Sequence, residues 1–174
     1  DLAGSTGLGE RLPPRDLQAL MSRYYDIVEN AVEAEGGVVI KFLGDGVLAM
    51  FPASISGPAH PARACTAARN VIAALRSAPL EGGTVRIGVN SGEVMIGDIG
   101  AAHHYSVDAL GDAVNVADRL QALAKTLFPN GREIVMVGEA TRDHPSANTM
   151  LYEECGVQLI EGRDVPISVS RLVI

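Results

Sequence analysis

Apolar side chains recur at helical spacing in three stretches of the chain, and each stretch predicts a helix. The first, residues 16–37, lies between a Pro-Pro pair and a Gly-Gly stop. The second, from about residue 59 to 78, is rich in alanine, which favours helix. The third, residues 111–127, carries valine, alanine and leucine along one stripe. These helices each need a partner surface, which the runs between them supply.

Shorter apolar runs between the helices predict strands. Residues 38–43 and 47–51 flank a Gly-Asp-Gly sequence, the turn chemistry of a tight hairpin, which places Asp45 at the tip. Residues 84–100 predict two further strands, and their glycines favour a second hairpin. Residues 101–110 are then expected to form a loop before the third helix.

The C-terminal part predicts a strand, a short helical turn and two more strands. If an apolar strand preceded Asp1, the core would run strand-helix-strand-strand-helix-strand. This α+β order predicts a ferredoxin-like βαββαβ core with a C-terminal strand extension, in a single domain over residues 1–174. The chain starts without methionine at a polar, turn-like stretch, so we expect a fragment of a longer chain whose first strand is missing. The C-terminal segments are residues 133–137, 139–144, 152–160 and 165–174.

Composition narrows the class of protein. With 174 residues and 47% hydrophobic side chains, the chain can bury one core. A net charge of −7 argues against holding nucleic acid by phosphate contacts. Cys65 and Cys155 are far apart, as in reduced cytoplasmic proteins, and each is expected to be a small apolar residue rather than a nucleophile. No apolar run is long enough for a membrane span, and we expect neither a span nor a signal peptide within this segment.

Two aspartates stand at glycine-flanked turns, from which a side chain can project into a cleft. Asp1 and Asp45 could together hold hard divalent cations, because Mg²⁺ usually takes one or two protein carboxylates plus substrate phosphates. The alternative is that Asp45 belongs to an ordinary hairpin turn, since Asp-Gly is common there.

A second candidate pair lies on the third predicted helix. Asn115 and Arg119 are four residues apart and therefore share one helix face. An amide and a guanidinium in this arrangement suit a phosphate or oxyanion, because Arg offers several donors in a fixed geometry. The alternative is an exposed polar helix face with no ligand.

Three blocks in order, KFLGDGVLAMF, RIGVNSGEVMIGDIG and LGDAVNVADRL, resemble the signature blocks of class III adenylyl and guanylyl cyclases. The resemblance extends over nearly the whole chain. It implies conversion of ATP to 3′,5′-cyclic AMP and pyrophosphate with two divalent metal ions, Mg²⁺ or Mn²⁺.

The resemblance also implies a role for each candidate. Asp1 and Asp45 become the metal ligands, Asn115 the ribose-orienting amide and Arg119 the transition-state arginine. It adds Lys41 and Asp108 as the pair that selects the purine. Adenine offers an acceptor at N1 and a donor at N6, so a lysine and an aspartate complement it, whereas guanine reverses both. Without the resemblance, both would be taken as solvated polar residues.

Because all six residues lie in one chain, the resemblance implies a homodimer with sites at the interface, and a sensor domain outside this segment. One position departs from the family pattern: Glu161 stands where a phosphate-binding lysine is usual, and Arg163 could partly replace it. This keeps open a degenerate, inactive cyclase-like module. A guanylate cyclase is a further alternative, and a diguanylate cyclase is disfavoured because its GG[DE]EF-type turn is lacking. His103 and His104 are expected to be surface residues.

Overall fold

A five-stranded sheet in the order β1-β4-β7-β9-β8 forms the centre of the computed structural model, which describes residues 1–80, 84–101 and 104–174. The β4–β7 pair is parallel and the other neighbours are antiparallel. Two separate hairpins, β2–β3 and β5–β6, complete the strands. The strands are β1 (Leu2–Ala3), β2 (Val38–Leu43), β3 (Gly46–Met50), β4 (Thr84–Val89), β5 (Met95–Ala101), β6 (His104–Leu110), β7 (Glu133–Gly138), β8 (Tyr152–Gln158) and β9 (Ile167–Leu172).

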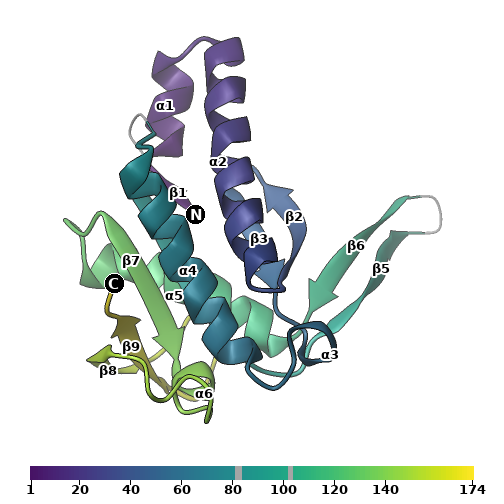
Figure 1. Ribbon diagram of the computed structural model, residues 1–174, viewed down its shortest axis with the longest axis vertical. Coiled ribbons are helices and arrows are strands. Elements are labelled where there is room, and N and C mark those ends of the chain that lie inside the picture. The colour runs from purple at the N-terminus through teal and green to yellow at the C-terminus, as the bar shows by residue number, and fades with distance from the viewer. Residues whose placement is uncertain (81–83, 102–103) are drawn as a thin grey trace.

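Helices cover both faces of this sheet. Figure 1 shows α2 and α4 running side by side, while the β5–β6 hairpin projects away from the body. The three predicted helices correspond to α2, α4 and α5, within two residues at most ends. The helices are α1 (Ser5–Arg11), α2 (Pro14–Ala34), α3 (Ala53–Ser56), α4 (His60–Ser77), α5 (Asp112–Leu127) and α6 (Glu139–Arg142). Every helix that the structure describes is too short or too polar to cross a lipid bilayer.

Strand β7 is buried on both faces, which explains its unbroken apolar sequence. Val135 and Val137 face the core shared with α2 and α4. Ile134 and Met136 face a second core formed with α5 and β9. The sheet is therefore a middle layer between two sets of helices.

The ferredoxin-like prediction is confirmed, with strand-helix-strand-strand-helix-strand supplied by β1, α2, β2, β3, α4 and β4. The expected turn at the start of the chain is wrong, because residues 2–3 form the short strand β1. That an apolar strand precedes Asp1 stays a prediction. Leu2–Ala3 pairs with β4, with Leu2 opposite Val85, and its apolar side chains are buried. Two residues are too few to show strand alternation in a sequence.

The second hairpin predicted within residues 84–100 is wrong. β4 lies between β1 and β7, whereas β5 pairs with β6 from Met95 opposite Leu110 to Ala101 opposite His104. The expected loop at 101–110 is thus largely a strand. The partners of β4 come from distant parts of the chain, which local turn signals cannot reveal.

Close packing between β4 and α5 depends on one glycine. A Cβ atom at Gly88 would lie 1.9 Å from the carbonyl oxygen of Ala117 and 2.8 Å from the amide nitrogen of Gln121. Only glycine allows the helix backbone to approach the strand this closely. This contact sets the position of α5, which carries two candidate site residues.

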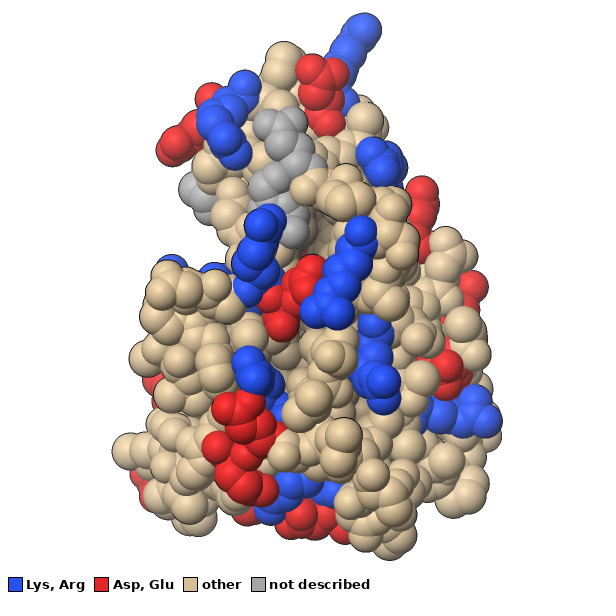
Figure 2. Space-filling model, turned by 60° about the vertical axis from the view of Figure 1, so that its left-hand side comes forward, with Lys and Arg blue, Asp and Glu red and all other residues tan. Residues whose placement is uncertain are grey.

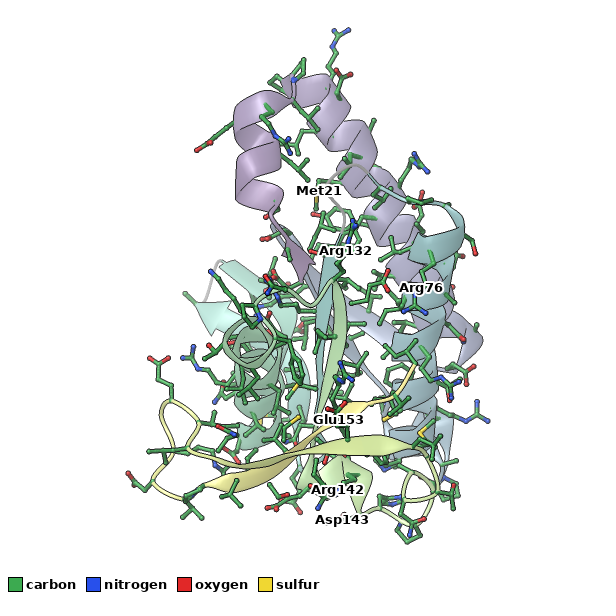
Figure 3. All side chains as sticks on the ribbon, turned by 90° about the vertical axis from the view of Figure 1, so that its left-hand side faces the viewer. Met21, Arg76, Arg132, Arg142, Asp143 and Glu153 are labelled. Carbon is green, nitrogen blue, oxygen red and sulfur yellow. The ribbon has the colours of Figure 1, made fainter. Side chains whose placement is uncertain are left out.

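An arginine joins the short helix α6 to the end of the sheet. Figure 3 shows Arg142 and Asp143 beside each other near β8 and β9. The Arg142 guanidinium donates to Glu154 on β8 at 3.1 Å and to the buried Ser170 hydroxyl on β9 at 3.1 Å. Asp143, which accepts a further hydrogen bond from Arg142, has a lowered pKa for that reason. We assign this cluster a structural role.

Candidate active site

The two predicted metal aspartates lie next to one another. Asp1 immediately precedes β1, and Asp45 occupies the tip of the β2–β3 hairpin. The Leu2 amide donates to the Asp45 carbonyl oxygen at 3.2 Å, which joins the two segments. The Ser5 hydroxyl, at the start of α1, donates to Asp45 Oδ2. The fold thus brings together two chain segments whose aspartates are 44 positions apart in the sequence.

The chemistry of this pair suits a hard cation that arrives with a substrate. Within the described ranges, no group of three or more His, Cys, Asp or Glu side chains is arranged to hold a metal ion. Two carboxylates leave most positions of an octahedral shell for water and phosphate oxygens, which is the usual arrangement for Mg²⁺. Asp1 and Asp45 therefore fit Mg²⁺ or Mn²⁺ in a nucleotide complex.

Lys41 and Asp108 form a direct ion pair between two different hairpins. Lys41 Nζ on β2 lies 2.5 Å from Asp108 Oδ2 on β6. Asp108 Oδ1 accepts a second hydrogen bond, at 2.8 Å, from the amide of Ala109. The hydrogen bond from Lys41 is the main cause of a lowered Asp108 pKa. Donor and acceptor are thus held side by side, each still partly exposed.

One cleft of about 960 Å³ connects most of the candidate residues. Asp1, Lys41, Asp108 and Asn115 all line it. Asp45 is not among the lining residues, but the next residue, Gly46, is. Within one chain, Asp1 and the purine pair therefore border the same open space.

Asn115 and Arg119 share an exposed face of α5, as their spacing predicts, but their surroundings differ. Asn115 lines the cleft. The Arg119 guanidinium instead makes ion pairs with Asp118 at 3.8 Å and with Glu161 at 3.5 Å. Arg119 is therefore held by acidic neighbours on its own chain.

The loop between β8 and β9 brings Glu161 to this position. Ile160 is buried in the core around α5, so it anchors the loop against that helix. Two residues further on, the Arg163 guanidinium pairs with Asp112 in the first turn of α5. Arg163, the expected substitute for a phosphate-binding lysine, is thus engaged with a carboxylate in this structure.

Arg86 is a cation of the cleft that the sequence analysis missed. It lies on β4, and its backbone amide donates to the Asp1 carbonyl oxygen at 3.0 Å. Arg86 lines the same cleft, and its Nε is buried without a hydrogen-bond partner among the described residues. The available signal was a single charged residue inside the apolar run TVRIGV.

The two cysteines lie on different elements. Cys65 is fully buried in α4, as expected, while Cys155 on β8 is half-buried, and the two thiols are not joined. His103 lies outside the described residues, and His104 begins β6.

The profile of the adenylate and guanylate cyclase catalytic domain matches residues 1–165. The chain belongs to this family. The cyclase domain is 33% identical to Adenylate cyclase 1 of Rhizobium meliloti (strain 1021) over 180 aligned residues, which are 99% of this chain and 26% of that protein. It thus spans about a quarter of that relative's length.

Solved structures agree with the family and the fold. A bacterial light-regulated adenylyl cyclase superposes with a TM-score of 0.81 at 26% identity, over 99% of this chain and 85% of that one. The guanylate cyclase domain of RhGC from Catenaria anguillulae, in complex with GTP, gives a TM-score of 0.84 at 19% identity, over 99% and 92% of the two chains. The same fold therefore occurs in an adenylyl cyclase and in a guanylate cyclase domain.

Proposed function

We propose that this cyclase domain is an adenylate cyclase that converts ATP to 3′,5′-cyclic AMP and pyrophosphate. The observation that carries the choice of ATP is the Lys41–Asp108 pair, 2.5 Å apart in the wall of the cleft. A lysine donor matches adenine N1, and an aspartate acceptor matches the N6 amino group. Guanine would present its O6 acceptor and N1 donor to the wrong partners.

The other residues then divide the work of an intramolecular phosphoryl transfer. Asp1 and Asp45 hold two divalent cations, which when bound acidify the ribose 3′-hydroxyl and neutralise the phosphates. Asn115 orients the ribose so that its 3′-hydroxyl releases its proton to solvent water, its 3′-oxygen bonds to the α-phosphorus, and the bond from the α-phosphorus to the bridging oxygen breaks to release pyrophosphate. Arg119 stabilises the developing charge, a contribution of on the order of a hundredfold in turnover. Arg86 is suited to bind the departing pyrophosphate, since it lines the cleft and its Nε has no hydrogen-bond partner among the described residues.

We further propose that the active unit is a homodimer. In this arrangement the metal aspartates of one subunit face the purine-binding, Asn115 and Arg119 residues of its partner. Apolar side chains on the projecting β5–β6 hairpin support it, because a surface of this kind usually contacts another protein. The exposed residues are Met95 (69%), Ile96 (43%), Tyr105 (68%), Val107 (52%) and Leu110 (52%).

The surroundings of the domain follow from the same proposal. Because the chain spans about a quarter of a curated relative, we infer that a sensor or regulatory domain lies elsewhere in the protein. Two unjoined cysteines favour the cytoplasm. Figure 2 shows basic and acidic side chains interspersed on one face rather than a continuous basic stripe, which agrees with a nucleotide rather than nucleic acid as ligand.

Product formation tests the proposed activity. The purified domain should produce cyclic AMP from ATP with Mg²⁺ or Mn²⁺, and far less cyclic GMP from GTP. The Asp45→Ala variant is the control for background turnover. A dominant cyclic GMP product would instead identify a guanylate cyclase.

Mixing two inactive variants tests the shared site. Asp45→Ala and Arg119→Ala subunits should regain activity together, because a heterodimer carries one intact site and one doubly damaged site. An inactive mixture with demonstrated subunit exchange would rule out the shared site.

Exchange of the purine pair tests the choice of nucleotide. Lys41→Glu combined with Asp108→Cys should weaken the preference for ATP, since the donor and acceptor pattern is removed. An unchanged ratio of kcat/KM for ATP and GTP would exclude these residues from purine selection.

The ion pair between Arg119 and Glu161 favours a second candidate, a cyclase-like module that binds nucleotide or dimerises without turnover. In such a module Arg119 stays paired with Glu161, and the Glu161 carboxylate in the β8–β9 loop repels the triphosphate. This candidate predicts that the dimer binds ATP, but produces no more cyclic AMP than the Asp45→Ala variant does.

A further inference from the structure

A tyrosine on α2 reaches the tip of the hairpin that carries Asp45. The Tyr25 hydroxyl donates to the backbone carbonyl oxygen of Gly44, the residue immediately before Asp45. The Tyr25 ring packs against Phe42 on β2, with centroids 4.3 Å apart and planes tilted by 36°. The packing on Phe42 joins α2 to strand β2, and the hydrogen bond to Gly44 joins α2 to the tip of the hairpin as well.

The tip has few other supports. Gly44 has a φ of +64°, and no neighbouring atom lies within 4 Å of a Cβ built there, so side-chain packing does not hold it. The remaining contacts act on Asp45 itself: the Leu2 amide binds its carbonyl oxygen and the Ser5 hydroxyl binds Oδ2. Among the described residues, Tyr25 supplies the side-chain hydrogen bond that restrains the preceding peptide.

We propose that Tyr25 is a positioning residue for the metal site. By holding the Gly44 carbonyl, its hydroxyl fixes the plane of the Gly44–Asp45 peptide. That plane sets the direction in which the Asp45 carboxylate leaves the backbone. Ser5 then selects the rotation of the carboxylate. Together they hold the Asp45 carboxylate in one orientation before any cation arrives, and this inference rests on the proposed metal-binding role of Asp1 and Asp45.

Pre-orientation of a protein side chain that binds a metal ion increases the affinity for that ion. Residues that orient metal ligands commonly change metal affinity by about 10-fold to 100-fold when they are altered. Loss of one neutral hydroxyl should lie at the lower end of that range. Because Tyr25 touches neither substrate nor metal in this arrangement, saturating metal should restore most of the turnover.

The Tyr25→Phe variant isolates the hydroxyl, since it retains the ring and the stacking on Phe42. Tyr152→Phe is a matched control, because the Tyr152 hydroxyl also donates to a backbone carbonyl, that of Ala147 at 3.1 Å, on another part of the fold. Binding of Mn²⁺ with a non-hydrolysable ATP analogue is measured by electron paramagnetic resonance. Amide hydrogen exchange of residues 43–47 is measured without metal.

Tyr25→Phe should weaken Mn²⁺ binding by about tenfold and speed exchange at residues 43–47, whereas Tyr152→Phe should change neither. Metal binding and exchange equal to those of the unaltered protein would overturn the positioning role, as would an equal loss in both variants. The Asp45→Ala variant tests the metal-binding role of Asp45 separately from the positioning role of Tyr25. If it binds Mn²⁺ as tightly as the unaltered protein, the metal assignment itself is wrong, and the role of Tyr25 falls with it.

Discussion

Neutralising Glu161 is expected to increase the catalytic efficiency of the domain. Its carboxylate lies 3.5 Å from the Arg119 guanidinium and draws that group toward the loop. In the proposed reaction, Arg119 must instead contact the transferring phosphoryl group. The change Glu161→Gln keeps the size of the side chain and removes its charge. Arg119 then no longer has to break an ion pair with Glu161 before it contacts the phosphoryl group.

The size of the effect follows from distance and exposure. Two unit charges 3.5 Å apart attract by about 1.2 kcal/mol in bulk water. The Glu161 side chain is 81% exposed and that of Arg119 is 43% exposed, so water and salt screen the pair. Exposed ion pairs contribute about 0.2–1 kcal/mol, and the upper value corresponds to about a fivefold change in rate.

Steady-state kinetics with ATP and Mn²⁺ measure this change. Glu161→Gln should raise kcat/KM up to about fivefold at low ionic strength, and by less in high salt because screening already weakens the pair. Glu33→Gln, on the exposed side of α2, makes the same change in net charge and should have no such effect. An equal gain in both variants, or none in Glu161→Gln, would refute the reasoning.

Three further predictions concern stability and titration. Gly88→Ala should lower the free energy of unfolding by about 1–3 kcal/mol in urea denaturation, whereas Gly97→Ala, with no atom within 4 Å of the added Cβ, should change it little. Burial raises the pKa of the Cys65 thiol to about 11, so native protein at pH 8 should resist alkylation there until it unfolds. The hydrogen bond from Lys41 lowers the Asp108 pKa. Ionised Asp108 therefore stabilises the fold above the ordinary carboxyl pKa of about 3.9, and this stability is lost as pH falls through the lower pKa of the folded state. Lys41→Met should raise the Asp108 pKa in an NMR titration.

Local pattern was sufficient for the elements that carry their own signals. The helical stripe between Pro14 and Ala34, the strands around the Asp45 turn and the double-faced apolar run of β7 all appear where periodicity places them. The same is true of the shared helix face of Asn115 and Arg119. In each case a repeat of 2 or 3.6 residues determines which side chains point together.

Strand partners and ion pairs required the tertiary structure. Nothing within TVRIGV shows that β4 pairs with Leu2–Ala3 on one side and with β7 on the other, because those pairings join distant segments. β6 escaped detection although Tyr105, Val107 and Ala109 alternate with polar residues in part of it. Its glycine- and histidine-containing surroundings favoured a loop over a strand.

By itself, the sequence determined the α+β class, the helices, the Asp45 hairpin and the family, because these depend on short-range periodicity and ordered motifs. The packing of separate elements places the start of the chain beside the Asp45 tip, pairs Lys41 with Asp108 and puts Arg86 in the lining of the cleft. It also decided that Glu161 reaches Arg119 from the β8–β9 loop. Contacts of this kind depend on how separate elements pack, and no repeat within either element specifies the residue that it will touch.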